Sequence, residues 1–526
     1  MNIVFPLRSL GALMLKSVVL GLFFLLAIGA STPSAAALDT ARATSLKSPL
    51  DAERQSLAEA GGKIENNDLD GARRLLGAVV AASSFADLTP EQQHAALFLL
   101  ASLQVQAGDA AALATATKAT AFSDFAVGQD WFVRLNAASA AGDDKDALWC
   151  ITTIAHRWPA TVSQIDYSYL EGLVARARSD KSLNDLRLGM LEALDDSHWH
   201  SNNVFRPGDY LRFDLILGLI ERGDIKHAQR VAEEVTSPNV ILELRIDRRF
   251  DAITKDDESR FDFPAAQTRD IERLRNAVHA QPDQLEGVRA LTIALIESDR
   301  AAEALSILDG TLARARPADG LKAPYSDISN LNWIMENRAI ALFHVGRAED
   351  AVEQFKQAAM RPENGGLNVS QQLDLAGLLD DLGRPAEALE RLKPVELQNV
   401  SPYGRTVIEG VKACAYAQTG DQAGLANSVN YLKAHELDAP GSDFDALVCA
   451  NELDAAAKVL IAELDDPELR TRVLVKLQDA PVPAHFTKWM IEQRQRVLTL
   501  KARPDVKTAI DKVGRIETLP APIWDL

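Results

Sequence analysis

The sequence is poor in aromatic residues and holds only three cysteines. Phe, Trp and Tyr together account for 6% of its 526 residues. Helices that pack closely through alanine need few large rings between them, so this scarcity is compatible with a helical protein. Hydrophobic residues make up 47% and charged residues 25%, which are ordinary values for a folded chain. The composition predicts a folded chain, and the pattern of residues along the sequence must indicate which fold it adopts.

An odd number of cysteines leaves at least one thiol free, or joins two chains, if the protein is exported. Cys150, Cys414 and Cys449 each lie in an apolar, helix-like stretch, so buried thiols are the expected state of all three. Cys414 and Cys449 fall in consecutive repeats, described below, and a bridge between them is the alternative.

Familiar catalytic motifs are missing. There is no Gly-x-Ser-x-Gly elbow, no phosphate-binding glycine loop and no Cys-x-x-Cys pair. His435-Glu436 begins like a zinc-protease motif, but Ala439 stands where the second histidine belongs. Asn66–Gly71 begins like a calcium loop, but its twelfth position is Gly77 instead of glutamate. We therefore predict no catalytic residue, no cofactor and no metal, and we do not expect an enzyme.

One polar and aromatic cluster still needs an interpretation. Residues 195–200 read Asp-Asp-Ser-His-Trp-His. His198 and His200 with the neighbouring carboxylates could hold a metal, or Trp199 could stack on a sugar ring. We expect a solvent-exposed loop, and a metal-dependent enzyme with a site near His198 and His200 is kept as an alternative.

The N-terminus resembles a secretory signal. Arg8 and Lys16 form a basic start, Ser17–Ala30 is apolar, and Ala35–Ala37 offers small residues for cleavage before Leu38. The apolar run is shorter than the ~20 residues that span a bilayer, although an uncleaved anchor is the alternative. No cysteine follows it closely, and no later segment is long and apolar enough to span a membrane. We predict a periplasmic or secreted protein with no stable membrane anchor after cleavage.

The chain is acidic, with a formal net charge of −18. Residues 1–37 hold two basic and no acidic residues, so removing them gives −20. Such a charge argues against nucleic acid and anionic lipid as main partners and is compatible with a basic protein partner.

A short phrase recurs along the chain. A turn residue is followed five positions later by alanine at the start of an apolar stretch, as in Gly346–Ala351 and Gly383–Ala388. Apolar residues three to four apart precede Gly346 and follow Ala351, and Pro362 ends the second run. The pattern predicts two amphipathic helices joined by a tight turn.

This unit resembles the tetratricopeptide repeat, a helix–turn–helix of 34 residues. Ala339, Gly346, Ala351, Phe355 and Ala358 occupy the family's small, turn, small, aromatic and small positions. The resemblance implies an all-α fold, an α-solenoid of antiparallel helical hairpins that forms a superhelix. Together with the signal-like N-terminus, which has a bacterial character, it suggests an exported bacterial protein of this family. Candidate hairpin turns lie at residues 67, 108, 142, 223, 299, 346, 383, 420 and 451.

The predicted organisation follows from these turns and from breaks in the pattern. The stretch 248–270 is polar, contains Pro264 and interrupts the helical periodicity. The predicted segments are a signal peptide (1–37), a diverged N-terminal repeat array (38–247), an irregular junction (248–270), a C-terminal repeat array (271–482), and a capping helix with a tail (483–526).

In the family, ligands usually lie in the concave groove formed by the first helix of each hairpin. The resemblance therefore implies a groove lined by three sets of residues: Glu286, Arg289, Ile293 and Glu297; Trp333, Glu336, Asn337, Ile340 and His344; and Ser370, Leu373, Asp374, Gly377 and Asp381. The groove is mainly apolar and acidic, so we expect a basic or amphipathic protein or peptide segment.

Three hypotheses for function follow. The first is a non-catalytic protein–protein interaction scaffold of the bacterial cell envelope. The second is a polysaccharide export or cell-wall assembly factor, with Trp199, Trp333 and Tyr210 as aromatic candidates. The third is the metal-dependent enzyme above. The sequence carries no indication of the oligomeric state.

Overall fold

The computed structural model describes residues 49–255, 257–315, 324–363 and 365–521. These residues form two compact units. Unit 1 runs to Asn203 and adds Tyr210–Gly218, and unit 2 consists of Val204–Asp209 and the chain from Leu219 onward. The predicted signal peptide and Trp524 of the tail lie outside the described residues.

The prediction of an all-α fold is confirmed. The described ranges consist of α-helices and short 3-10 turns, and their only extended pairings are isolated bridges. Among these residues, no helix is both long and apolar enough to cross a membrane.

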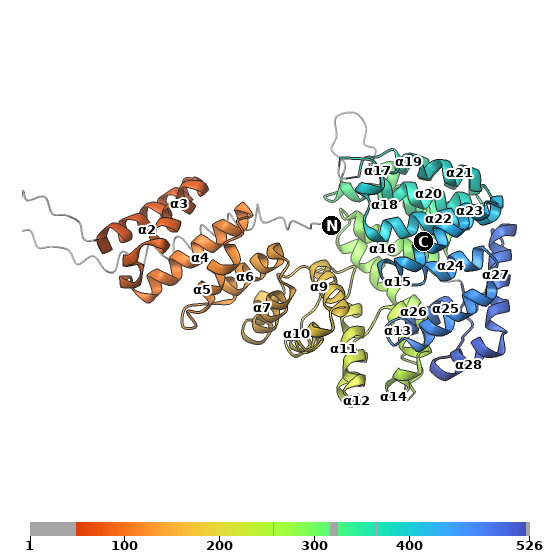
Figure 1. Cartoon of the computed structure of the whole chain (residues 1–526), viewed down its shortest axis with the longest axis horizontal. Coiled ribbons are helices and arrows are strands. Elements are labelled where there is room, and N and C mark those ends of the chain that lie inside the picture. Colours follow the sequence, from red (N-terminus) through yellow and green to blue (C-terminus); the bar gives the residue numbers. More distant parts are fainter. Residues whose placement is uncertain (1–48, 256, 316–323, 364, 522–526) are drawn as a thin grey trace, which may run out of the picture. The chain divides into compact units, whose positions relative to one another are not determined.

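Unit 1 is a row of helical hairpins (Figure 1). Sequence-adjacent helices pack as pairs, for example α2 on α3, α4 on α5 and α6 on α7, while α10 packs on α7. Its helices are α2 (Pro49–Glu65), α3 (Leu69–Ala81), α4 (Pro90–Ala107), α5 (Ala112–Thr120), α6 (Gly128–Ala141), α7 (Asp144–Arg157), α8 (Pro159–Val162), α9 (Tyr167–Ser179), α10 (Asn184–Asp196) and most of α11 (Asp209–Glu221).

Unit 2 continues the same architecture. Here α16 pairs with α17, α18 with α19, α20 with α21 and α22 with α23 (Figure 1). The first helices of successive hairpins also contact each other, for example α16 with α18 and α20 with α22. Its helices are α12 (Ile225–Ala232), α13 (Pro238–Ile246), α14 (Asp251–Thr254), α15 (Phe263–Ala280), α16 (Leu285–Glu297), α17 (Ala301–Ala315), α18 (Leu331–His344), α19 (Ala348–Ala359), α20 (Val369–Asp381), α21 (Pro385–Leu392), α22 (Pro402–Thr419), α23 (Gln422–Ala434), α24 (Ser442–Cys449), α25 (Leu453–Asp465), α26 (Arg470–Lys476), α27 (Lys488–Lys501) and α28 (Pro504–Val513).

Every predicted hairpin turn adopts the left-handed conformation that ends a helix. The backbone has positive φ at Asn67, Gly108, Gly142, Gly223, Asp299, Gly346, Gly383, Gly420 and Asn451. At Gly346 the next amide, from Arg347, donates to the Leu342 carbonyl at 2.8 Å, which satisfies a carbonyl that the helix leaves open. Glycine has no Cβ to strain this geometry, and Asn and Asp tolerate it better than other residues.

At seven of the nine turns the residue five positions later is an alanine that lies where the two helices of the hairpin meet, while leucine takes this position after Gly108 and Gly420. The solvent-exposed fraction is 0% for Ala72, Ala147, Ala228, Ala304, Ala351, Ala388 and Ala456. A larger side chain at such a position would force the helices apart, so a small residue sets the close approach. This packing explains how the chain builds a core with few aromatic rings.

The cysteines differ from the expected three buried thiols. Cys414 of α22 and Cys449 of α24 form a disulfide, with their Cα atoms 5.0 Å apart. The two helices pack directly on each other, which brings positions 35 residues apart into bonding range. The repeat period gives only a separation along the sequence and does not set the spatial offset between α22 and α24, so it could not predict the bridge. Cys150 is free and buried, as expected.

The C-terminal region is more helical than predicted and folds back on the start of unit 2. The capping helix predicted within 483–526 appears as α27, and α28 follows it where a tail was expected. After α28, Arg515 donates its amide to the Ile246 carbonyl at 3.0 Å. Arg245 forms an ion pair with Glu517 at 2.6 Å. The segment predicted as a junction, 248–270, lies inside unit 2 and makes some of these contacts.

Candidate functional site

A cavity of about 980 Å³ lies in unit 2. Its walls come from the first helices of four successive hairpins, α16, α18, α20 and α22, and from the loops that precede α20 and α22. The lining residues are Arg289, Trp333, Glu336, Glu363, Gly366, Leu367, Val369, Ser370, Leu373, Asp374, Pro394, Glu396, Val400, Ser401, Tyr403, Gly404 and Val407. The volume falls at the upper end of the range for small-molecule and peptide side-chain pockets.

A pair of carboxyl groups lies in this cavity. Glu336 of α18 is 9% exposed and accepts a hydrogen bond from Gln371 Nε2 at 2.7 Å. It is also hydrogen-bonded to the carboxyl group of Asp374, one turn further along α20. Two carboxyl groups can share a hydrogen bond only if one of them holds a proton. The pair is therefore a proton-sharing unit at the surface of the cavity.

Burial determines how this pair titrates. Desolvation raises the pKa of Glu336, because a charged carboxylate is disfavoured away from water. Desolvation, together with the negative charge of Glu336, raises the pKa of Asp374 well above its usual range. Both pKa values are raised, so the two carboxyl groups together retain one proton more readily than two separate, exposed carboxyl groups would.

One cation faces the pair from α16. The guanidinium of Arg289 lies over the Trp333 ring, 4.5 Å from its centroid. Burial lowers the pKa of Arg289, while the charge of Glu336 raises it. Its Nε atom is buried and has no hydrogen-bond partner among the described residues. Arg289 therefore balances part of the negative charge through space and holds the indole in place.

Glu363 fixes a third carboxylate at the cavity. Its oxygens accept hydrogen bonds from the backbone amides of Val369 and Ser370 at 3.1 and 3.3 Å and from Ser370 Oγ at 2.9 Å. These donors form the first turn of α20, where a helix favours negative charge. This carboxylate serves the helix terminus and adds to the negative potential of the cavity.

Six of the fourteen groove residues predicted from the sequence line this cavity, namely Arg289, Trp333, Glu336, Ser370, Leu373 and Asp374. Asn337 is instead buried, and its amide joins the two helices by donating to Thr292 Oγ1 at 2.8 Å and to the Arg289 carbonyl at 3.0 Å. Ile340 and Ile293 are partly buried, and Ile340 packs against two core clusters.

His344 and Asp381 lie at the other ends of α18 and α20, against the segment that leads into α27. The ring of His344 is 4.8 Å from that of His485, and burial lowers the pKa of His344 to about 4. The carbonyl of Asp381 accepts a hydrogen bond from Thr487 Oγ1, and burial raises the pKa of the Asp381 carboxyl to about 7. The chain's own C-terminal segment covers this end of the helices.

Sequence reasoning missed the rim of the cavity. Leu367 is 45% exposed and Tyr403 is 61% exposed, and both line the opening. They precede or begin the first helices of their hairpins, whereas the family pattern points to the middle of those helices. The available signal was the apolar and aromatic character of positions just after Pro362 and Pro402, where polar loop residues would be ordinary.

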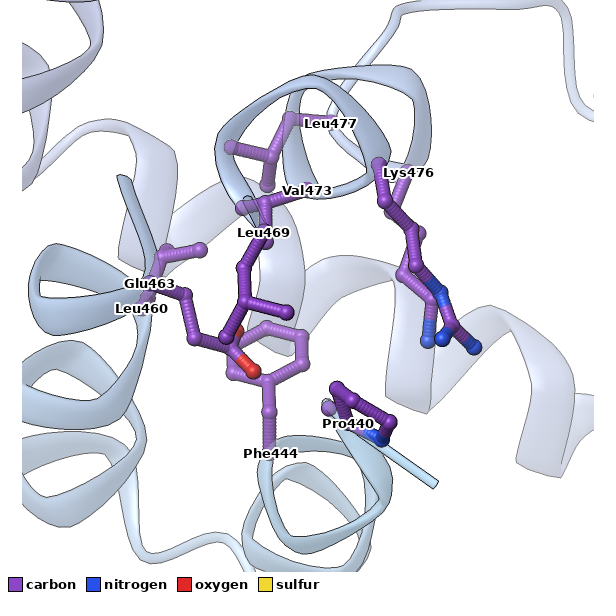
Figure 2. A pocket seen from close by; sticks show the side chains of 10 residues that line it. Pro440, Phe444, Leu460, Glu463, Leu469, Val473, Lys476 and Leu477 are labelled. Carbon is purple, nitrogen blue, oxygen red and sulfur yellow. The ribbon is translucent and has the colours of Figure 1, made fainter. Parts of the chain in front are cut away.

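A second cavity in unit 2 is too small to hold a ligand. It measures about 10 Å³, close to the space of a single water molecule. Figure 2 shows the Glu463 carboxyl group among apolar side chains that include Phe444, Leu469 and Val473. Burial raises the pKa of Glu463 to about 7.

The cluster at 195–200 is arranged differently from the expected loop. Trp199 is 8% exposed, and its ring stacks on Tyr167 with centroids 6.5 Å apart. His198 and His200 are exposed. In the ranges that the structure describes, no group of three or more His, Cys, Asp or Glu side chains is placed to hold a metal ion. Trp199 is thus a packing residue, and its ring is too buried to stack on a sugar.

Comparisons with known proteins return no matching family model and no matching curated protein. Two solved structures of helical repeat type align over most of the chain. The APC/C hetero-tetramer Cut9-Hcn1 is 14% identical, with a TM-score of 0.28 over 96% of this chain and 94% of that one. A circular tandem repeat protein with novel repeat topology is 13% identical, with a TM-score of 0.14 over 88% of this chain and 97% of that one.

Proposed function

We propose that the protein is a non-catalytic interaction scaffold of the tetratricopeptide type, which binds a segment of a partner protein in the unit 2 cavity. The observation that carries the proposal is the cavity itself, which four successive hairpins build with buried carboxyl groups inside and exposed apolar side chains at its rim. A segment that combines a basic residue with apolar neighbours complements both parts.

The bacterial cell envelope is the proposed location. The predicted signal segment supports it, and so does the Cys414–Cys449 bridge, because disulfides persist mainly in oxidising compartments. Expression with and without residues 1–37, followed by cell fractionation and N-terminal sequencing, tests this part. Retention of the whole full-length chain in the cytoplasm would contradict it.

A library of acetylated and amidated decapeptides, varied in net charge and in apolar content, tests the binding function. We expect the full chain to bind peptides that are both basic and apolar. The double variant Leu367→Ser/Tyr403→Ser should weaken this binding at least about tenfold, because both side chains are exposed at the cavity.

Met360→Ser is the matched control. Met360 is 76% exposed and does not line the cavity, so the same kind of substitution there should leave binding unchanged. Failure of every peptide to bind, or equal binding by the Leu367/Tyr403 variant, would contradict a peptide-binding cavity.

Direct glycan recognition is the second candidate, and one observation favours it. Trp333 and Tyr403 both line the cavity, and aromatic rings beside carboxyl groups can hold a sugar. Tyr210, the other aromatic candidate, is 45% exposed in unit 1. A glycan array probed with the protein and with the Tyr403→Ser variant distinguishes the two functions. Glycan recognition predicts a signal that the substitution removes, whereas peptide binding alone predicts no such signal.

A further inference from the structure

Resting on the proposed function, we propose that Glu336 and Asp374 form the receptor for one ammonium or guanidinium group of the bound segment, and that this cation enters by displacing the proton the two carboxyl groups share. The cavity then selects a lysine or arginine side chain within an apolar stretch, and binding releases a proton to solvent.

The charges that face the pair favour a cation. Arg289 of α16 is the positive group nearest to it, while Glu363 in the loop before α20 adds a negative one. Glu396 contributes a further carboxylate at the cavity wall. Arg206 and Glu286 also act on Arg289, and their charges shift its pKa in opposite directions. With one proton on the pair, Arg289 balances its remaining charge, and the carboxylates of Glu363 and Glu396 are left in excess.

Arg289 does not already occupy the receptor position. Among the described residues, no ion pair within 4.0 Å joins Arg289 to Glu336 or to Asp374. Its guanidinium is held over Trp333 instead. The carboxyl oxygens of the pair therefore keep a hydrogen-bonding capacity that a ligand with several N–H donors can use.

The exchange balances in charge. In the free protein the shared proton leaves the pair with a charge of −1 instead of −2, which burial favours. When a ligand cation arrives, the pair loses this proton to water and carries −2 against the ligand cation and Arg289. No net charge is added to the buried cavity, which avoids the cost of an uncompensated buried ion.

The surroundings specify what carries the cation. Leu373, Val400 and Val407 supply apolar walls, and the exposed ring of Tyr403 stands at the opening. A methylene stem with a terminal cation fits such a site, because the stem contacts the apolar wall and an aromatic ring favours a cation over its face.

Three small probes test the inference on the full chain. Hexylammonium and hexylguanidinium carry the cation, and hexanol is the neutral control of the same length. Isothermal titration from pH 5.5 to 8.5 should show the affinity of both cations rising with pH, by up to about tenfold per unit, because one proton is released. Hexylammonium itself stays protonated, since alkylammonium groups titrate near pH 10. Repeating the titration in phosphate and Tris buffers counts the proton from the difference in buffer ionisation heat.

Two variants locate the effect. Asp374→Asn keeps the shape of the side chain and removes one of the two carboxyl groups that share the proton, so it should weaken hexylammonium binding about tenfold and flatten the pH dependence while hexanol is unaffected. Glu336→Gln should act in the same direction if Asp374→Asn fails to fold. Glu390→Gln is the control, because Glu390 is exposed, pairs with Lys393 and does not line the cavity.

Several results would overturn the cation receptor. They are binding of hexylammonium no tighter than that of hexanol, tight binding without pH dependence or proton release, and no binding of any probe. Decapeptides that bind through Leu367 and Tyr403 without a charge preference would refute the receptor and leave the scaffold standing. Cationic probes that bind as expected, with no peptide binding at all, would refute the scaffold and leave the receptor.

Discussion

Asp247 and Thr471 are 224 residues apart in the sequence, yet the Thr471 hydroxyl donates to Asp247 Oδ2 at 2.8 Å. Asp247 is fully buried and also pairs with Arg249 at 2.8 Å. Asp247 follows directly after α13, and Thr471 lies in the first turn of α26. The two helices pack together. The start and the end of the unit 2 repeat array therefore contact each other through a buried polar network.

Asp247→Ala should destabilise unit 2 by about 3 kcal/mol, because it leaves the half-buried Arg249 without its charge partner. Chemical denaturation followed by circular dichroism measures the loss. Asp257→Ala is the control within the same region, since Asp257 is exposed and bonds only to nearby groups such as Ser259. Equal stability of the Asp247 variant and the wild type would show that the network does not hold the two ends together.

The disulfide predicts a definite count of thiols. The native chain should react slowly with Ellman's reagent, because Cys150 is buried and burial raises the pKa of its thiol. The denatured chain should show one thiol, and the denatured and reduced chain should show three. Three thiols before reduction would contradict the bridge.

Loss of the bridge should also lower stability. The double variant Cys414→Ser/Cys449→Ser is expected to lose about 2–4 kcal/mol, because the closed loop no longer restricts the unfolded chain. The two cysteines are 35 residues apart, and the expected loss of stability follows from a closed loop of this length. The reduced wild-type protein should unfold at the same denaturant concentration as the variant, and a lower midpoint for only one of them would point to a different cause.

Two glycines separate turn geometry from helix packing. Gly346 has φ of 80°, so Gly346→Ala should cost about 1 kcal/mol although nothing lies within 4 Å of the added methyl group. Gly310 lies inside α17 with equally open space and a helical backbone, so Gly310→Ala should stabilise by about 0.5–1 kcal/mol. The opposite signs are read from denaturation midpoints, and destabilisation by both substitutions would contradict the assignment.

The free energy of unfolding should fall as the pH rises from 4.5 to about 7, because Glu463 has a higher pKa in the folded chain than in the unfolded chain. The carboxyl group titrates at about 7 in the folded chain and near its ordinary value of 4.5 when unfolded. Between these values the unfolded chain releases the proton while the folded chain keeps it, so the free energy of unfolding decreases with pH.

Glu463→Gln removes this effect. We expect the variant to be more stable than the wild type at pH 8, by about 1 kcal/mol after allowance for solvent screening, and the difference to vanish near pH 4.5. Thermal unfolding across this pH range measures it, with Glu452→Gln as a control at an exposed position. A difference that is the same at both pH values would rule out titration of Glu463 as its origin.

The repeat architecture was readable from the sequence because its determinants are local. A left-handed turn needs Gly, Asn or Asp, and the close approach of two helices needs alanine, so the phrase at Gly346–Ala351 marks both within six residues. Diverged units such as those at Asn67 and Asn451 follow the same chemistry with a different turn residue.

The candidate site was only partly readable. The resemblance to the tetratricopeptide repeat implied Glu336 and Asp374 as groove residues, and both line the cavity. The resemblance did not show that the Asn337 amide bonds to the neighbouring helix, or that Tyr403 reaches the same cavity from a later hairpin. Those facts depend on the offset between successive hairpins, which loop residues control.

The sequence by itself determined the helical hairpins, their turns and the residues that pack inside each one, because contacts within a hairpin join residues close in the chain. Only the tertiary structure decided the cysteine bridge, the proton-sharing carboxyl pair and the contact of Asp247 with Thr471. Each of these joins different hairpins, and its geometry comes from the accumulated rotation and spacing of the repeats between them, which no local pattern encodes.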